Sequence, residues 1–554
     1  MISDELRRMI GQMLICGFPS PRVDDQARKI LDEFYVGNFY YFSRNIQSAA
    51  QCAALSAELS AMTYDKLGIS PIIATDQEGG IVSRLVEGAA LTPGAAAVGA
   101  AILGMRKSLE KKYKKPQDKA RELPLFQVRT MARNTGEILR SCGISMTAAP
   151  DMDVNIEPAN PIIGTRSYGD DPDNVAEAAI TQMKGLAEGG VIAMIKHFPG
   201  HGNVKSDSHL GIPVNDTDRQ KLMDTEFKTF REAIREGAEA LMTAHVRYTG
   251  VDPENPATLS KIIMTDLTRK EFGFEGVIGT DCLEMDAIRA AYGCGEGAVR
   301  AIEAGVDLLT ISHTYTAVSQ AAQGIYEAVE SGRISEQRIR ESYERIMKLK
   351  AKYGLMESQS IDPEKAETMV NSQGRQFVCE DLMNEAITLL QGDFDLDLQK
   401  GGYLTVACDQ TPATGAEDMK QLSFAHMMGE KFGCPAMALH LNPEPEEVSR
   451  AVASIREQLP AMRSEETEPV SLILGLYNAR FREGQKKIVE EILKMKQEGL
   501  IRLYVFLLGA PYDLPLVKEA DCVITTYEYT RLSLAALLKA MEEHRFPGVS
   551  PFKL

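Results

Sequence analysis

Short apolar segments alternate with longer segments of helical periodicity along roughly the first 350 residues of the chain. Apolar segments of five to seven residues are typical of buried strands. They predict eight strands, at residues 12–18, 36–42, 71–75, 144–149, 191–195, 240–246, 276–280 and 306–311. The segments of helical spacing predict helices between these strands, among them residues 25–34, 49–62, 126–141, 175–188, 218–236 and 284–304.

This alternation indicates the architecture of the first part of the chain. Strands that alternate with helices pair in parallel, because each helix returns the chain to the start of the next strand. Eight such units form a (β/α)8 barrel, the fold that we expect for residues 1–355. The last helix of this domain is predicted at residues 335–355.

A second alternating pattern occupies the remainder of the chain. We interpret residues 356–390 as a linker and a connecting helix, with a polar, irregular segment at 357–374 and a helix at 377–390. Residues 391–554 are predicted to form a flavodoxin-like α/β sandwich. Its five strands are expected at residues 403–408, 436–441, 470–475, 503–508 and 521–526. No G-x-G-x-x-G or P-loop motif follows these strands, so we expect a structural or oligomeric role for this domain.

Composition narrows the range of partners. The net charge is −17 with a pI near 5.2, which argues against nucleic acid and anionic membrane as partners. A basic segment around residues 105–119 is interpreted as a solvated insertion. Nine cysteines form no C-x-x-C pair, and neither a secretory h-region nor an 18-residue apolar segment occurs. The sequence therefore predicts a cytoplasmic protein with reduced thiols.

Polar residues recur where the predicted barrel strands end, which is the face where barrel enzymes place their active sites. These residues are Arg44, Asn45, Asp76, Asp151, Asp153, Lys196, His197, His245, Asp281 and His313. A single such residue could be a cap of the next helix. The recurrence after seven of the eight strands predicts a pocket.

The segment from Lys196 to His209 is the densest in titratable groups. It leaves a predicted strand and then carries Pro199, Gly200 and Gly202, so it is expected to be a loop. Asp207 and His209 lie close enough in this loop to form a dyad, in which the carboxylate sets the tautomer and proton affinity of the imidazole. Such a histidine can act as general acid and then as general base, although a local surface contact is the alternative.

A second chemical feature is Asp281, which ends the apolar segment G-V-I-G-T-D. A carboxylate there is a nucleophile, a metal ligand or the N-cap of the helix predicted from residue 284. No metal site is expected, because Pro199 and Gly200 interrupt the helix that would bring His197 and His201 onto one face.

Charged residues elsewhere suggest a sugar-binding pocket. Carboxylate and guanidinium groups form charge-assisted hydrogen bonds of the kind that sugar hydroxyls accept and donate. The candidate residues are Asp76, Arg84, Arg166, Lys196 and His197. The glycine in G-T-R-S-Y at 164–168 permits close approach of the backbone that carries Arg166.

Five motifs together resemble glycoside hydrolase family 3, and more narrowly its bacterial β-N-acetylglucosaminidase branch. They are D-Q-E-G-G at 76–80, G-T-R-S-Y at 164–168, K-H-F-P-G-H-G at 196–202 followed by D-S-H, M-T-A-H-V at 242–246, and G-V-I-G-T-D-C-L-E-M at 276–285. The resemblance implies that Asp281 is the nucleophile and that His209 with Asp207 is the acid/base dyad. It also implies that Asp76, Arg84, Arg166, Lys196 and His197 hold the sugar.

The function that this resemblance implies is a retaining exo-β-N-acetylglucosaminidase acting without a cofactor on small oligosaccharides from the cell wall (muropeptides) or from chitin. A phosphorylase, a β-glucosidase of the same family and an inactive sugar-binding protein are the alternatives. A histidine acid/base carries no negative charge and would repel phosphate less than a carboxylate, which keeps the phosphorylase open. Two departures stand out: Cys282 replaces the second aspartate of S-D-D-L-S-M, and the segment 105–119 is expected beside the site. The oligomeric state is not predicted.

Overall fold

The computed structural model describes residues 2–113, 118–205, 211–408, 422–463 and 469–554. The chain forms two compact units, each described separately below. The first comprises Met1–Glu78, Ser83–Leu91 and Gln127–Phe377. The second comprises Gly79–Val82, Thr92–Phe126 and Val378–Leu554.

The first unit contains a parallel β-barrel of eight strands that follow one another in chain order. The strands are β1 (Leu14–Cys16), β2 (Asn38–Tyr41), β3 (Ile72–Thr75), β6 (Met146–Thr147), β7 (Ile192–Phe198), β9 (Ala240–Thr243), β11 (Val277–Thr280) and β12 (Leu309–Ile311). Neighbouring strands pair in parallel, and β12 also pairs with β1. A parallel bridge between Gly279 and Leu308 joins β11 to β12 and nearly closes the barrel. The predicted barrel fold and all eight of its strands are confirmed.

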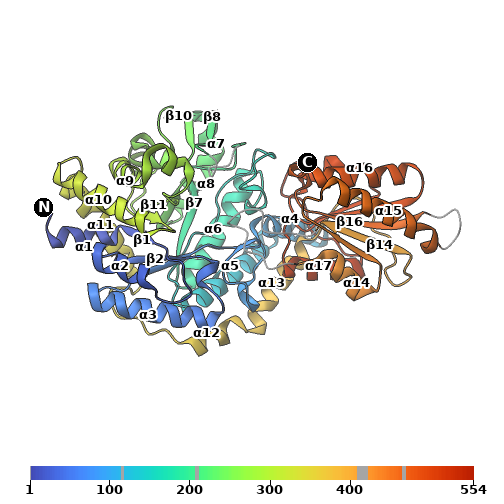
Figure 1. Ribbon diagram of the computed structural model, residues 1–554, viewed down its shortest axis with the longest axis horizontal. Helices are drawn as coiled ribbons and strands as arrows, with labels where there is room; N and C mark the ends of the chain where they lie inside the picture. Colours follow the sequence, from blue (N-terminus) through green and yellow to red (C-terminus); the bar gives the residue numbers. More distant parts are fainter. Residues whose placement is uncertain (1, 114–117, 206–210, 409–421, 464–468) are drawn as a thin grey trace. The chain divides into compact units, whose positions relative to one another are not determined.

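Helices surround these strands (Figure 1). They include α1 (Asp4–Gln12), α2 (Asp25–Phe34), α3 (Ala49–Leu67), α5 (Asp118–Ser141), α6 (Pro172–Glu188), α7 (Arg219–Asp224), α8 (Glu226–Arg235), α9 (Asp286–Ala304), α10 (Tyr315–Glu330) and α11 (Glu336–Lys352). The helix predicted over 218–236 is therefore two helices. They meet at Thr225, whose φ of −121° and ψ of −97° are not helical. The buried Glu226 side chain accepts a hydrogen bond from Asn215 Nδ2 just after this break.

Helix α2 shows how local sequence sets these elements. Asp24 is its N-cap and accepts a hydrogen bond from the backbone N–H of Ala27, which satisfies one of the free donors of the first turn. Its buried residues Ala27, Ile30, Leu31 and Phe34 recur at helical spacing and so form one apolar stripe. The helix ends at Tyr35, which adopts the left-handed conformation of a C-cap at φ 55°.

The second unit is an α/β sandwich around one six-stranded sheet. Its strands are β13 (Thr388–Gly392), β14 (Tyr403–Cys408), β15 (Ala436–Leu439), β16 (Val470–Leu476), β17 (Ile501–Leu507) and β18 (Cys522–Thr525). The sheet order is β13-β18-β17-β16-β14-β15, in which the five strands after β13 are parallel. Numbered along the chain, these five have the order 2-1-3-4-5, as predicted for a flavodoxin-like fold.

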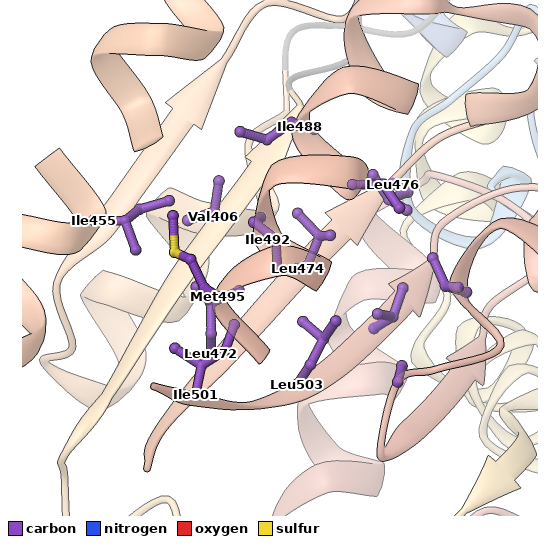
Figure 2. Close-up of a cluster of buried hydrophobic side chains, with 14 of the residues drawn as sticks. Val406, Ile455, Leu472, Leu474, Leu476, Ile488, Ile492, Met495, Ile501 and Leu503 are labelled. Carbon is purple, nitrogen blue, oxygen red and sulfur yellow. The ribbon is translucent and has the colours of Figure 1, made fainter. Parts of the chain in front are cut away.

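The core of this sheet lies between its strands and two helices, α15 (Pro445–Met462) and α16 (Glu483–Gln497). Figure 2 shows alternate strand residues such as Leu472 and Leu474 facing Ile455, Ile488 and Ile492 of these helices. Alternation of this kind follows from the two-residue period of a strand, which places every second side chain on the same face.

Two segments differ from their sequence-based interpretation. The predicted polar linker contains helix α12 (Pro363–Val370), which packs against α3. The helix predicted to reach residue 390 is α13 (Gln373–Ala386), and residues 388–392 instead form β13, antiparallel to β18. The segment between Ala386 and Gly392 is apolar enough for either structure, and an available sheet edge decides between them.

The described residues of the basic segment around 105–119 belong to two helices, the end of α4 and the start of α5. Helix α4 (Ala95–Tyr113) begins with the buried residues Ala96, Ala97 and Val98, and only its later turns carry exposed charges such as Lys111 and Lys112. The interpretation as a solvated insertion is therefore correct only for the exposed end of α4. Residues 113–120 include side chains outside the described part of the chain.

The state of the cysteines and the apolar character of the helices were also predicted from the sequence. All nine cysteines are buried thiols and none is joined to another by a disulfide, which agrees with the prediction of reduced thiols. Among the described residues, no helix combines the length and the apolar character needed to span a bilayer.

A buried carboxylate lies in the second unit where two glycine-containing segments meet. Glu528 Oε2 accepts the backbone N–H of Gly94 at 2.6 Å, and its Oε1 accepts the Thr530 hydroxyl at 2.8 Å. A Cβ at Gly80, where φ is +59°, would lie 2.8 Å from Glu528 Oε2, so only glycine fits there. Burial raises the pKa of Glu528 to about 7, even though these hydrogen bonds favour the ionised form.

Glu528→Gln is expected to stabilise the second unit at alkaline pH. A folded-state pKa above the ordinary 4.5 means that this carboxyl contributes stability below pH 4.5, which is lost as the pH rises through about 7. The full shift corresponds to about 3 kcal/mol. Thermal unfolding should therefore show a Tm advantage of the variant that is larger at pH 8.5 than at pH 5. An equal Tm difference at both pH values would show that ionisation of Glu528 costs nothing.

Candidate active site

Side chains from several strand ends of the barrel meet within the first unit. Asp76 directly follows β3, Lys196 and His197 lie on β7, and Asp281 directly follows β11. Parallel strands in a barrel place their carboxyl ends on one face, so residues far apart in the chain become neighbours. Each of the five predicted sugar-binding residues contacts another member of that set directly, through an ion pair or a hydrogen bond.

Asp76 bridges two buried cations. Its Oδ1 lies 2.7 Å from Lys196 Nζ, and its Oδ2 lies 3.3 Å from Arg84 Nη2. Burial disfavours the carboxylate, but Lys196 and Arg84 outweigh that cost and hold the pKa of Asp76 well below its usual range. Asp76 and the nearby Glu78 raise the pKa of Lys196 against the opposing effect of burial. Both groups are therefore charged at neutral pH.

A second carboxylate, Glu78, completes this arrangement although the sequence analysis did not select it. Its two oxygens accept a bidentate pair of bonds from Arg166, Nε at 2.9 Å and Nη2 at 2.7 Å. Lys196 Nζ lies 2.6 Å from Oε1 of Glu78. Burial opposes ionisation, but Arg166 and Lys196 lower the pKa of Glu78 to about 2. Its place two residues after Asp76 in D-Q-E-G-G was the available signal.

His197 is held as a neutral imidazole of one tautomer. Its Nδ1 lies 2.7 Å from Asp153 Oδ2, and its Nε2 lies 3.3 Å from Arg166 Nη2, which can only donate. Burial and the neighbouring Arg166 lower the pKa of His197 to about 4, whereas burial raises the pKa of Asp153 to about 6. At neutral pH the Nδ1 proton therefore points to an ionised Asp153, and Nε2 accepts from Arg166.

Asp153 organises the loop that follows β7. Its Oδ1 accepts the backbone N–H of His201 at 2.6 Å, and the imidazole of His201 packs edge-on against His197 with ring centres 5.9 Å apart. Two residues earlier, Asp151 lies 3.7 Å from Arg166, and burial together with Asp153 raises the pKa of Asp151 well above its usual value. Asp153 was identified in the sequence only as a strand-end residue.

Asp151, Asp153 and His197 also form the type of donor set that can hold a cation. One ligand atom from each lies within 4.8 Å of the others. Asp153 already forms hydrogen bonds with His197 and with the His201 backbone. The positively charged Arg166 guanidinium contacts both Asp151 and His197. We therefore interpret these residues as support for Arg166 and His197.

Asp281 is a partly buried carboxylate that forms no ion pair with the described residues. Its Oδ1 accepts the backbone N–H of Cys282 at 2.7 Å. Burial opposes ionisation, but His245, His197 and Lys196 lower the pKa of Asp281 below its usual value. The alternative of an N-cap is wrong, because α9 begins at Asp286 with Met285 as the preceding cap residue. A deprotonated, incompletely solvated carboxylate of this kind is suited to nucleophilic attack.

The remaining strand-end residues differ in their roles. Asp207 and His209 lie outside the described residues, so the predicted dyad has no structural account here. Arg44 donates to the backbone oxygens of Phe18 and Ser312, and thereby ties the loops after β1, β2 and β12 together. His313 stacks on Phe42 with ring centres 5.3 Å apart. We find no catalytic geometry for these two residues.

The site thus combines two buried cations, Lys196 and Arg84, and the partly buried Arg166 with carboxylates that neutralise them. Charged groups fixed in this way can donate and accept hydrogen bonds without reorganising, and hydrogen bonds to charged groups are roughly twice as strong as neutral ones. Such a cluster can bind several hydroxyls of one sugar while Asp281 remains available for chemistry at a neighbouring carbon.

Comparisons with known proteins agree with this architecture. The model of the glycosyl hydrolase family 3 N-terminal domain matches residues 5–349. Beta-hexosaminidase A of Pseudoalteromonas piscicida is 32% identical over 347 residues, which are 59% of this chain and 55% of that protein. A beta-hexosaminidase of Neisseria meningitidis serogroup C is 36% identical over 288 residues, covering 52% of this chain and 74% of the relative.

Solved structures show the same similarity. A family 3 beta-N-acetylglucosaminidase from Paenibacillus sp. FPU-7 aligns with a TM-score of 0.87 and 32% identity over 100% of this chain and 99% of that one. NagZ from Neisseria gonorrhoeae, solved with N-trifluoroacetyl-D-glucosamine, aligns with a TM-score of 0.54 and 28% identity over 68% of this chain and 97% of that one. Since the family model covers more than half of the residues, the chain belongs to glycosyl hydrolase family 3.

Proposed function

We propose that this glycoside hydrolase is a retaining exo-β-N-acetylglucosaminidase. It removes a terminal β-linked N-acetylglucosamine through a covalent glycosyl-Asp281 intermediate. The observation that carries the proposal is the ionised, partly buried Asp281 at the end of β11, whose pKa is lowered by the same Lys196 that joins Asp76 and Glu78. The names of the relatives, beta-hexosaminidase and beta-N-acetylglucosaminidase, support the choice of sugar.

The sugar is bound by the charged cluster. Asp76, Arg84, Arg166, Lys196 and His197 contact the hydroxyls of the non-reducing-end residue, and Glu78 holds Arg166 and Lys196 in place. Their positions on separate loops allow contacts around one pyranose ring. A pocket that contacts one terminal sugar from several sides favours exo cleavage over cleavage within an oligosaccharide chain.

The reaction has two displacements. In the first, a carboxylate oxygen of Asp281 bonds to C1 while the C1–O bond to the aglycone breaks, and His209 gives its proton to the departing oxygen. In the second, His209 takes a proton from water, whose oxygen bonds to C1 and releases Asp281. Asp207 orients the imidazole in both steps. This assignment of Asp207 and His209 rests on the D-S-H motif.

We further propose that the natural substrates are muropeptide fragments of the cell wall or chitin-derived oligosaccharides, and that the enzyme works in the cytoplasm. The acidic composition and free buried cysteines support the compartment. Both substrate types present a terminal β-linked N-acetylglucosamine to the same pocket.

Activity on aryl glycosides tests the proposal directly. The chain should release the chromophore from an aryl β-N-acetylglucosaminide, with kcat/KM far above that for the matching β-glucoside. The reaction is run with and without inorganic phosphate, and the sugar product is identified. A glucoside preference would favour the β-glucosidase, N-acetylglucosamine 1-phosphate would show the phosphorylase, and no turnover of either glycoside would contradict the proposed activity.

Arg166→Ala is expected to lower kcat/KM on the N-acetylglucosaminide at least about tenfold. The change removes a charge-assisted hydrogen bond to the sugar and leaves Glu78 with one cation fewer, a loss of about 1.5–3 kcal/mol or more. Arg129→Ala is the matched control, because Arg129 pairs with Glu188 at the surface of the same unit. Equal kcat/KM in the Arg166 variant and the wild type would remove Arg166 from the sugar site.

A further inference from the structure

His245 contacts the residue that follows the nucleophile and has no role in the steps above. It follows β9 and is 1% exposed. Its Nε2 lies 3.0 Å from the backbone oxygen of Cys282, the residue after Asp281, and its Nδ1 lies 2.7 Å from the hydroxyl oxygen of Thr258. Both ring nitrogens therefore have an oxygen partner within the first unit.

The protonation state of His245 follows from counting hydrogen-bond donors. A backbone oxygen can only accept, so Nε2 must carry a proton to bond Cys282. The Thr258 hydroxyl, which has one proton to donate, also lies 3.0 Å from the backbone oxygen of Ala244, and that oxygen can only accept. We infer that the Thr258 proton goes to Ala244, in which case the contact between Thr258 and Nδ1 uses a proton on Nδ1. With a further proton from the Thr243 hydroxyl at 2.8 Å, both acceptor positions of Thr258 are filled.

In this arrangement His245 is an imidazolium close to Asp281. The Cys282 peptide joins the two residues, because its N–H donates to Asp281 Oδ1 and its oxygen accepts from His245. Positive charge near a carboxylate favours the ionised form. Of the groups that lower the pKa of Asp281, His245 is the strongest, ahead of His197 and the Cys282 N–H, with Lys196 also contributing.

We propose that His245 is a positioning residue for the nucleophile: its doubly protonated imidazole clamps the Cys282 peptide that orients Asp281 and supplies the positive charge that keeps this carboxylate ionised. The inference rests on the proposed role of Asp281 and deepens it. His245 thus makes two separable contributions to Asp281: a hydrogen bond to the Cys282 oxygen and a positive charge.

Two variants separate these contributions. In His245→Gln the side-chain amide can still donate to the Cys282 oxygen, but the charge is lost. In His245→Phe both the donor and the charge are lost while an aromatic ring of similar size remains. Circular dichroism and thermal unfolding establish that each variant is folded, and Thr258→Val, which removes only the hydroxyl partner, is compared in parallel.

The readout is the ratio of variant to wild-type kcat/KM between pH 7 and pH 4. This ratio cancels the titrations that the enzymes share, including those of His197, Lys196 and Tyr40, which also face Asp281. Loss of the positive charge raises the pKa of Asp281 by about one unit or more, so a larger share of the nucleophile is protonated in acid. The ratio should therefore fall as the pH decreases for both variants, and Phe should show a further pH-independent loss of about tenfold.

A spectroscopic measurement keeps the inference independent of turnover. In protein labelled with ¹⁵N-histidine, the ring signals that disappear in His245→Gln should show two protonated nitrogens at pH 7. A neutral tautomer, or a pH-independent activity ratio in the Gln variant, would overturn the inference. Failure of the proposed function would appear differently, as an inactive wild type that still shows a doubly protonated His245.

Discussion

Asp281→Asn is expected to keep the barrel folded and to lose about four to six orders of magnitude in turnover. An amide oxygen is a poor nucleophile, so the first displacement has no efficient substitute. The fold should persist because Asn Oδ1 can still accept the backbone N–H of Cys282, the hydrogen bond that the Asp281 side chain makes with the described residues. The loss should appear equally with good and poor leaving groups.

The matched control for this variant is Asp286→Asn. Asp286 lies in the first turn of α9, five residues later, and pairs with Arg289 at the surface. Steady-state kinetics on an aryl N-acetylglucosaminide should show near wild-type activity for this control. Turnover by Asp281→Asn above about one per cent of wild type, or a comparable loss in Asp286→Asn, would contradict the assignment of the nucleophile.

His209→Ala should lose activity to an extent that depends on the leaving group. Proton transfer by a positioned side chain contributes roughly 10²–10⁴-fold, and a poor leaving group needs that proton in the first step. A dinitrophenolate leaves without it, so this substrate should form the glycosyl-enzyme readily and then stall, giving a burst followed by slow turnover. Asp207→Asn should show a milder form of the same pattern, because its imidazole remains.

A series of aryl glycosides with graded leaving-group pKa, measured with and without azide, tests this role. The control is His313→Ala, because His313 stacks on Phe42 and has no proposed part in proton transfer. Azide needs no general base and should rescue the second step of His209→Ala. If the variant loses the same factor for every leaving group and azide restores none of it, the dyad is not the acid/base.

The barrel could be predicted because each of its strands is a short apolar segment between amphipathic helices. Helix α2 was predicted with the same bounds that the structure shows, since its caps and apolar stripe are local. The break at Thr225 and the strand β13 were not predicted. They depend on a buried side chain, Glu226, and on a free sheet edge at β18, which are tertiary features.

The sequence identified most residues of the site, but it did not select Glu78 and did not show which side chains pair. Asp76, Lys196 and His197 were identified as strand-end residues, and the ion pairs place them together. The partners Glu78 and Asp153 lie 88 and 44 residues from the groups that they hold, Arg166 and His197. Residues so far apart in the chain show no periodic pattern that would link them. Only the folded structure therefore shows which side chains pair.

One measurement tests the central claim that Asp281 forms a covalent glycosyl-enzyme. A 5-fluoro-N-acetylglucosaminyl fluoride keeps the 2-acetamido group, and its fluorine slows both displacements while the activated leaving group favours the first. Intact mass spectrometry should show the enzyme heavier by one glycosyl residue, and peptide mapping should place the label on Asp281. A label on Glu284 or Asp286, or turnover of the reagent with no labelled enzyme, would contradict the account.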